Sequence, residues 1–228
     1  MRILITGGGC REYIDSVRVV TNSSTGRTSA ELADFFAEKG HEVTLITAES
    51  AIKAKHATVK VIVFGTGAEL SHAIENELCA KPYNAVIHAA AVSDYVPAQI
   101  IIGGQTFKAG KEVSKLHSEN DLTVVFKPAP KIADSLHEWA KKGGNPNAKI
   151  ICFKLTNNAD QNEKNRAVTK LFSHSNSDYI VANDLSEITK DLHPFKIIDS
   201  KGQIFASGQN NESMANALLF LLELESEK

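Results

Sequence analysis

Strands alternate with helices along most of the chain, and this alternation constrains the fold more than any other feature. The apolar run RILIT (2–6) ends in three glycines, which is typical of a buried strand that feeds a tight turn. A helical pattern then ends near Gly40, and a second apolar strand, Val43–Thr47, follows directly. Repeated strand and helix units predict an α/β fold with a doubly wound, Rossmann-like and mostly parallel sheet.

The alternation continues to about residue 184, and the tail then changes character. We expect further strands at 59–64, 84–91, 121–127, 149–155 and 178–184, and helices at 68–80, 130–142 and 163–173. FKIID and QIFASG around SKGQ predict a C-terminal hairpin, and an apolar helix, Ser213–Leu224, follows it. The stretch 93–119 has no clear periodicity and is predicted to be a long loop. We treat 1–228 as one nucleotide-binding domain.

Composition and charge exclude several classes of function. With 23% charged residues and a formal net charge of -2, the chain is not built to coat a nucleic acid. No apolar run approaches the ~18 residues of a membrane span, and the apolar run before Gly7 is too short for a signal peptide. We therefore expect a cytoplasmic protein. Asn22 and Asn211, each in an Asn-x-Ser triplet, then never meet the glycosylation machinery.

The three cysteines have no framework or metal-site spacing. They are Cys10, Cys79 and Cys152. Free thiols in a reducing compartment account for them.

Four polar or glycine-rich stretches follow predicted strands, where ligands of open parallel sheets bind: GGGCRE, AAAVSDY, FKLTNN and ANDL. Gly7, Gly8 and Gly9 either let backbone N–H groups approach a phosphate or simply form a tight turn. The pattern lacks the third glycine of a dinucleotide fingerprint, which weakens an NAD interpretation. In NSSTG (22–26), a hydroxyl group caps the next helix, or the stretch helps to cradle a phosphorylated ligand. Asp94 in AAAVSDY accepts from a base or ribose, or serves as a loop residue.

Four ordered motifs resemble those of one known family over nearly the whole chain. They are ITGGGCREYIDSVRVVTNSSTGR, AAAVSDY, KLHSENDLTVVFKPAPKI and IVANDL. The family is that of phosphopantothenate–cysteine ligase, also called phosphopantothenoylcysteine synthetase. The resemblance implies that 4′-phosphopantothenate and cysteine are joined through an acyl-cytidylate in coenzyme A biosynthesis, with CTP converted to CMP and pyrophosphate. Members are often fused behind a flavin-dependent decarboxylase, so this chain resembles the free-standing form.

The resemblance also implies roles for individual residues. The catalytic asparagine falls on Asn22, and the lysine that stabilises the triphosphate falls on Lys115, with Lys111 as the fallback. The implied nucleotide-binding positions are Gly7, Gly8, Gly9, Ala90, Asp94, Pro130, Lys131, Ile132, Ala133, Phe153 and Lys170. Mg²⁺ is expected to bridge phosphate oxygens, without a metal site of the protein's own. A homodimer is expected, with the late hairpin and terminal helix as a candidate interface.

Three positions depart from the family pattern. Cys10 replaces the usual threonine after the glycines, His174 replaces a second late-helix lysine, and His117 stands where a small or polar residue is usual.

Two alternative functions remain open. A short-chain-type reductase needs a lysine four residues after its tyrosine, but Gln99 follows Tyr95 at that spacing. A non-catalytic nucleotide-binding protein on the same fold is the other alternative.

Overall fold

An eight-stranded sheet forms the centre of the computed structural model, which describes residues 1–116 and 121–227. Six strands are parallel: β1 (Arg2–Gly7), β4 (Glu42–Ala48), β5 (Lys60–Phe64), β6 (Ala85–His88), β10 (Lys149–Thr156) and β11 (Tyr179–Asp184). The hairpin β12 (Phe195–Asp199) and β13 (Ile204–Gly208) adds two antiparallel strands. The sheet order is β13-β12-β11-β10-β6-β1-β4-β5. The predicted α/β class, parallel sheet and late hairpin are confirmed.

The strand order reverses between β1 and β6. From β1 the chain runs outward through β4 and β5, then returns to β6 on the other side of β1 and continues to β10 and β11. Open parallel sheets bind ligands beyond the carboxyl ends of the strands at such a reversal. The turns after Gly7 and His88 therefore border the expected binding position.

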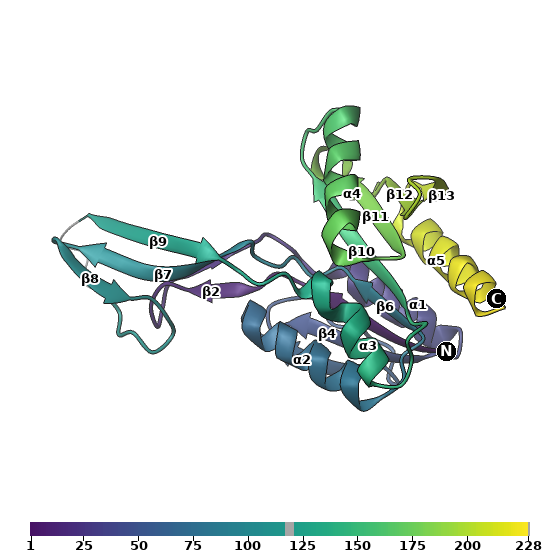
Figure 1. Cartoon of the computed structure of the whole chain (residues 1–228), viewed down its shortest axis with the longest axis horizontal. Coiled ribbons are helices and arrows are strands. Elements are labelled where there is room, and N and C mark those ends of the chain that lie inside the picture. The colour runs from purple at the N-terminus through teal and green to yellow at the C-terminus, as the bar shows by residue number, and fades with distance from the viewer. Residues whose placement is uncertain (117–120, 228) are drawn as a thin grey trace.

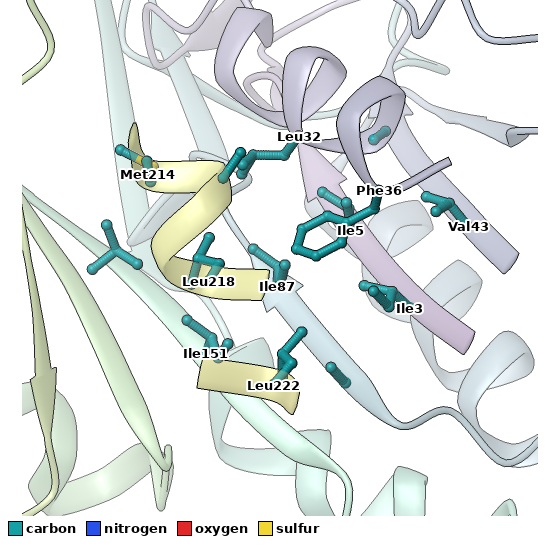
Figure 2. Close-up of a cluster of buried hydrophobic side chains, with 14 of the residues drawn as sticks. Ile3, Ile5, Leu32, Phe36, Val43, Ile87, Ile151, Met214, Leu218 and Leu222 are labelled. Atoms are coloured by element: carbon teal, nitrogen blue, oxygen red, sulfur yellow. The ribbon is translucent and has the colours of Figure 1, made fainter. Parts of the chain in front are cut away.

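Helices cover both faces of the sheet because the strands are apolar on both sides (Figure 1). On one face, Ile3 and Ile5 pack with Phe36 of α1 (Arg27–Glu38) and Leu218 of α5 (Asn211–Ser226), as Figure 2 shows. On the other face, Leu4 packs with residues of α2 (Gly67–Ala80) and α3 (Leu136–Lys142). The alternation of Ile3, Leu4 and Ile5 follows the two-residue period of a strand. The helix α4 (Gln161–Ser175) packs along β10 and β11.

Five further strands form an extension that we call the arm (Figure 1). Its three-stranded antiparallel sheet contains β7 (Tyr95–Ile102), β8 (Gln105–Lys108) and β9 (Leu122–Pro128). The short hairpin β2 (Arg11–Tyr13) and β3 (Val19–Thr21) lies beside it. We define the arm as residues 11–21, 95–116 and 121–128.

The arm corrects two expectations. The stretch 93–119 is not one long loop, because it holds β7 and β8, joined through Gly103 and Gly104, which both have positive φ. This glycine pair permits a tight hairpin that has no helical or parallel-strand signature. The strand expected at 121–127 exists as β9, but it pairs with β7 instead of joining the central sheet. His117 and the rest of 117–120 lie outside the described residues.

The start of α3 also differs from expectation. The segment expected to be helical from Pro130 starts with a 3-10 turn, η1 (Ile132–Ser135), before α3. A second 3-10 turn, η2 (Leu185–Glu187), follows β11. Among the described helices, none is both long and apolar enough to cross a membrane.

Candidate active site

A cleft of about 1280 Å³ lies where the strand order reverses, and we call it the first cleft. Its wall comes from segments far apart in the sequence: 21–29, 89–92, 153–155, 188–193 and 210–212. Gly8, Asp94 and Asn183 complete much of the lining. These segments follow the carboxyl ends of β1, β6, β10 and β11 or begin α1 and α5, so the fold itself assembles the cleft.

A second cleft of about 570 Å³ lies at the base of the arm. Arg11, Tyr13 and Val17 line it, together with Thr21–Ser24, which also lines the first cleft. The segment Thr21–Ser24 is therefore a wall shared by two hollows. Asn22 stands in this wall, exposed, and its Nδ2 donates to the carbonyl oxygen of Val92 at 3.2 Å.

The glycine turn after β1 is packed against the chain itself. A Cβ on Gly7 would lie 1.7 Å from Oγ of Ser29, and a Cβ on Gly9 would lie 2.3 Å from the carbonyl oxygen of Asn22. A Cβ on Gly8 would meet Cβ of Ala48 at 2.6 Å. These contacts give all three glycines a packing reason, which favours the tight-turn alternative. Phosphate binding by this turn stays a prediction.

The start of α1 corrects the expected hydroxyl cap. The N-cap residue is Gly26, with φ 70° and no side-chain cap hydrogen bond. Only Thr25 reaches the first turn, where its Oγ1 accepts a long hydrogen bond of 3.4 Å from the Arg27 N–H. The left-handed conformation of Gly26 also fits a close approach, because a Cβ there would meet Ala51 at 2.7 Å. Ser23 and Ser24 instead line both clefts.

Three lysines surround Asp94 at the rim of the first cleft. Lys131 Nζ forms an ion pair with Asp94 Oδ1. The hydrogen bond from Lys131, with smaller contributions from Lys154 and Lys170, holds the pKa of Asp94 below its ordinary value. Lys154, which lines the cleft beside Phe153, is a residue that the sequence analysis missed. The sequence could have indicated Lys154, because it lies near the carboxyl end of a predicted parallel strand, where ligands of such sheets bind.

The predicted site residues do not all converge. Five of them line the first cleft: Gly8, Asn22, Ala90, Asp94 and Phe153. Lys170 does not line the first cleft, but its charge helps to lower the pKa of Asp94. Pro130, Lys131, Ile132 and Ala133 lie at the start of η1, where the Ile132 side chain is buried in the core and Lys131 pairs with Asp94.

Lys115 lies on the arm and does not line either cleft. The next residue, Leu116, donates its N–H to Asp15 Oδ2 at 3.3 Å, in the turn between β2 and β3. Backbone and Arg18 donors hold the pKa of Asp15 near 2, because they stabilise its carboxylate. Lys111, the fallback, lies over the ring of Tyr13 at 5.5 Å, at the edge of the second cleft.

Two of the departures from the family pattern have structural explanations. His174 Nδ1 lies 2.6 Å from Asp134 Oδ1, so this side chain ties α4 to η1. Cys10 is fully buried, and burial raises the pKa of its thiol to about 12. A thiol held protonated in this way is a packing residue and no nucleophile.

Comparison with known proteins identifies the family of this chain. The family described as DNA/pantothenate metabolism flavoprotein C-terminal domain matches residues 1–223. The chain belongs to this family. The coenzyme A biosynthesis bifunctional proteins CoaBC of Thermococcus kodakarensis and Methanocaldococcus jannaschii are each 34% identical to it, over 81% and 82% of this chain. The matches cover 41% of each relative, so the chain spans about two fifths of their length.

A solved structure of the family has the same fold. The DNA/pantothenate metabolism flavoprotein from Streptococcus pneumoniae superposes with a TM-score of 0.85 at 28% identity, covering 98% of this chain and 99% of that one. The family membership expected from the four sequence motifs is thus confirmed.

Proposed function

We propose that this protein is a phosphopantothenate–cysteine ligase of coenzyme A biosynthesis, acting in the cytoplasm. It joins 4′-phosphopantothenate to cysteine and converts CTP to CMP and pyrophosphate. One observation carries the proposal: Asn22, the residue that the family motif marks as catalytic, stands in the wall shared by two clefts. A ligase must bring an acid and a nucleotide together at one point, and this wall offers that point. The relatives' names, which refer to coenzyme A biosynthesis, support the same pathway.

In the proposed first step, the nucleotide occupies the first cleft and the acid approaches from the second. Asp94, Ala90 and Phe153 hold the cytidine, and Lys154 and Lys170 face the phosphates. A carboxylate oxygen of the acid attacks the α-phosphorus, a new O–P bond forms, and the bond to pyrophosphate breaks. The products of this step are the acyl-cytidylate and pyrophosphate.

In the second step, the neutral amine of cysteine attacks the acyl carbon. The C–N bond forms, the bond to CMP breaks, and the amine loses one proton to solvent. Negative charge develops on the acyl oxygen during this attack. The Asn22 amide carries a second N–H besides the one directed at Val92, and a donor aimed at a developing oxyanion stabilises the transition state.

Mg²⁺ takes part in the proposed reaction only as an ion bound to the nucleotide. Within residues 1–116 and 121–227, no group of three His, Cys, Asp or Glu side chains is arranged to hold a metal ion. We therefore assign no protein ligands to Mg²⁺. When bound to the triphosphate, it would neutralise phosphate charge.

Product analysis tests the proposed function. The protein is incubated with CTP alone, with CTP and phosphopantothenate, and with both plus cysteine, and pyrophosphate and CMP are measured. We expect pyrophosphate only when the acid is present, and free CMP with the ligated product only when cysteine is added. Binding of CTP without turnover in any combination would instead support the non-catalytic alternative.

Lys154→Gln is expected to raise the KM for CTP roughly 10- to 100-fold, because one charge-assisted contact to phosphate is worth about 1.5–3 kcal/mol. The value of kcat should change less, since Asn22 is untouched. Lys201→Gln is the matched control: Lys201 is exposed in the turn between β12 and β13, which lies beside the start of β11, away from the carboxyl ends that border the cleft. Equal KM values for both variants would remove Lys154 from the proposed site.

We further propose a homodimer that forms through the arm. Eight large apolar side chains of the arm are at least 37% exposed: Val17, Val19, Val20, Tyr95, Phe107, Leu122, Val125 and Phe126. The helix α5 buries Leu218, Leu221 and Leu222 in the core but leaves Phe220 and Leu224 exposed, so the late hairpin and helix stay the second candidate interface. Apolar surface gathered in one region is typical of an interface.

Val125→Glu is expected to convert the dimer to a monomer, because it places a charge within the exposed apolar surface of β9. Light scattering measures the mass of each variant in solution. Phe220→Glu, on the exposed side of α5, is the control and should leave the dimer intact. Loss of the dimer in Phe220→Glu alone would move the interface to the C-terminal helix.

A further inference from the structure

A buried polar pair lies directly beneath the floor of the first cleft. Thr6, fully buried on β1, and His88, 8% exposed on β6, are partners in the register of the two strands at the reversal. Thr6 Oγ1 lies 2.8 Å from His88 Nδ1. Their preceding neighbours, Ile5 and Ile87, point into the apolar core on the opposite face (Figure 2). Polar groups at such a position cost stability unless they are paired, so a role other than packing is indicated.

The pair holds one backbone amide of the cleft floor. The N–H of Ala90, which lines the first cleft, donates to Thr6 Oγ1 at 3.2 Å. The neighbouring amides are held by backbone atoms only: the N–H of Ala89 donates to the carbonyl oxygen of Thr6, and that of Ala91 to Gly8. Of the three described amides 89–91, that of Ala90 is thus the one held by a side chain.

Counting donors and acceptors assigns the tautomer of His88. Thr6 Oγ1 already accepts from the Ala90 N–H, and its hydroxyl carries one proton that needs an acceptor. His88 Nδ1 supplies that acceptor only if it carries no proton itself. No other acceptor for this hydroxyl proton is recorded within residues 1–116 and 121–227, so the hydrogen bonds assign the ring proton of a neutral His88 to Nε2. Burial favours the neutral ring, since it lowers the pKa of His88 to about 4.

We propose that Thr6 and His88 act as a positioning pair, which fixes the Ala90 amide so that the cleft floor fits the nucleotide part of the reacting complex. This inference rests on the proposed ligation for the identity of the ligand. His88 fixes the direction of the Thr6 hydroxyl, Thr6 fixes Ala90, and neither side chain lines the first cleft. They are positioning residues and not catalytic ones.

The chain contains a matched control for this pair. Thr47 on β4 is also fully buried and lies beside Gly7 in the strand register, one residue past Thr6. Its hydroxyl has no hydrogen-bond partner within the described part of the chain. Thr6→Val and Thr47→Val therefore make the same isosteric change on adjacent buried strands, but only the first removes a link to the cleft.

Steady-state kinetics of the full chain test the proposal. Thr6→Val is expected to lower kcat/KM for CTP by about 10- to 100-fold, because a small misplacement of a positioning group has effects of that order. Thr6→Ser, which keeps the hydroxyl, should restore activity to within about threefold of wild type. Thr47→Val should match wild type. Equal values for Thr6→Val and Thr47→Val, or equal losses in Thr6→Ser and Thr6→Val, would overturn the proposal.

Two further measurements do not depend on activity. Hydrogen exchange of the Ala90 amide should be faster in Thr6→Val than in wild type and unchanged in Thr47→Val. The nitrogen chemical shifts of the wild-type His88 ring should report a proton on Nε2. A proton on Nδ1, or unchanged exchange at Ala90, would overturn the positioning pair. If wild type turns over no CTP, the proposed function fails, and these two measurements still decide the role of Thr6 and His88.

Discussion

Asn22→Ala is expected to lower kcat about 10²–10³-fold while leaving the thermal midpoint close to that of wild type. Loss of one donor to a developing oxyanion typically has an effect of this size. Asn22 is exposed, and its single described side-chain hydrogen bond, to Val92, is 3.2 Å long. Exposed substitutions of this kind usually change the free energy of unfolding by less than about 0.5 kcal/mol. Single-turnover measurement of pyrophosphate and product, beside calorimetry, separates chemistry from folding.

Asn216→Ala provides the matched control for this variant. Asn216 is an exposed asparagine on α5 whose Nδ2 also donates to one backbone carbonyl, that of Glu212 at 2.9 Å. It lines neither cleft. We expect Asn216→Ala to retain wild-type kcat. An Asn22→Ala protein that melts early yet remains active would show that Asn22 serves the local backbone and not the reaction.

Gly7→Ala is expected to destabilise the fold, because the new Cβ would lie 1.7 Å from Oγ and 2.4 Å from Cβ of Ser29 on α1. Contacts this short force α1 away from β1, and overpacking of a buried site costs about 1–3 kcal/mol. Denaturant or thermal unfolding measures the effect directly. Turnover per folded molecule should change much less than stability does.

A second substitution makes this prediction sharper. Ser29→Gly removes both clashing atoms, and the nearest remaining atom, the Ser29 Cα, would be 3.8 Å from the new Cβ. Glycine inside a helix costs about 1 kcal/mol by itself. The double variant should nevertheless be more stable than Gly7→Ala, and the double-mutant cycle measures the coupling. If Gly7→Ala melts like wild type but loses CTP binding, the turn acts as a phosphate cradle, as the sequence alone allowed.

Local patterns in the sequence were sufficient for the central fold. Apolar periodicity identified the parallel strands and the helices between them, because burial on a sheet face or a helix stripe repeats every few residues. The arm was predicted only in part: a strand was expected where β9 lies, but β7 and β8 were missed. Its strands β7 and β9 are mostly half-buried or exposed, and β9 pairs with a partner about 25 residues away that lacks a regular alternation.

The site was predicted only in part. Asn22, Ala90, Asp94 and Phe153 were expected from the motifs, and the structure brings these four to one cleft. The ion pair between Asp94 and Lys131 was not expected, although both residues were named. A motif identifies residues within one segment of the chain. The charge environment of Asp94, in contrast, depends on three lysines from separate elements: the N-cap of η1, β10 and α4.

The sequence by itself determined the order of the elements, the parallel sheet and the position of Asn22 between a glycine turn and a helix. Those features depend on residues close together in the chain. Only the tertiary structure decided that Gly26 is the N-cap of α1, that Asn22 lies in a wall between two clefts, and that His88 supports Ala90 through Thr6. The last contact joins residues 82 positions apart. Such contacts depend on how strands order themselves within the sheet, and local periodicity carries no record of that order.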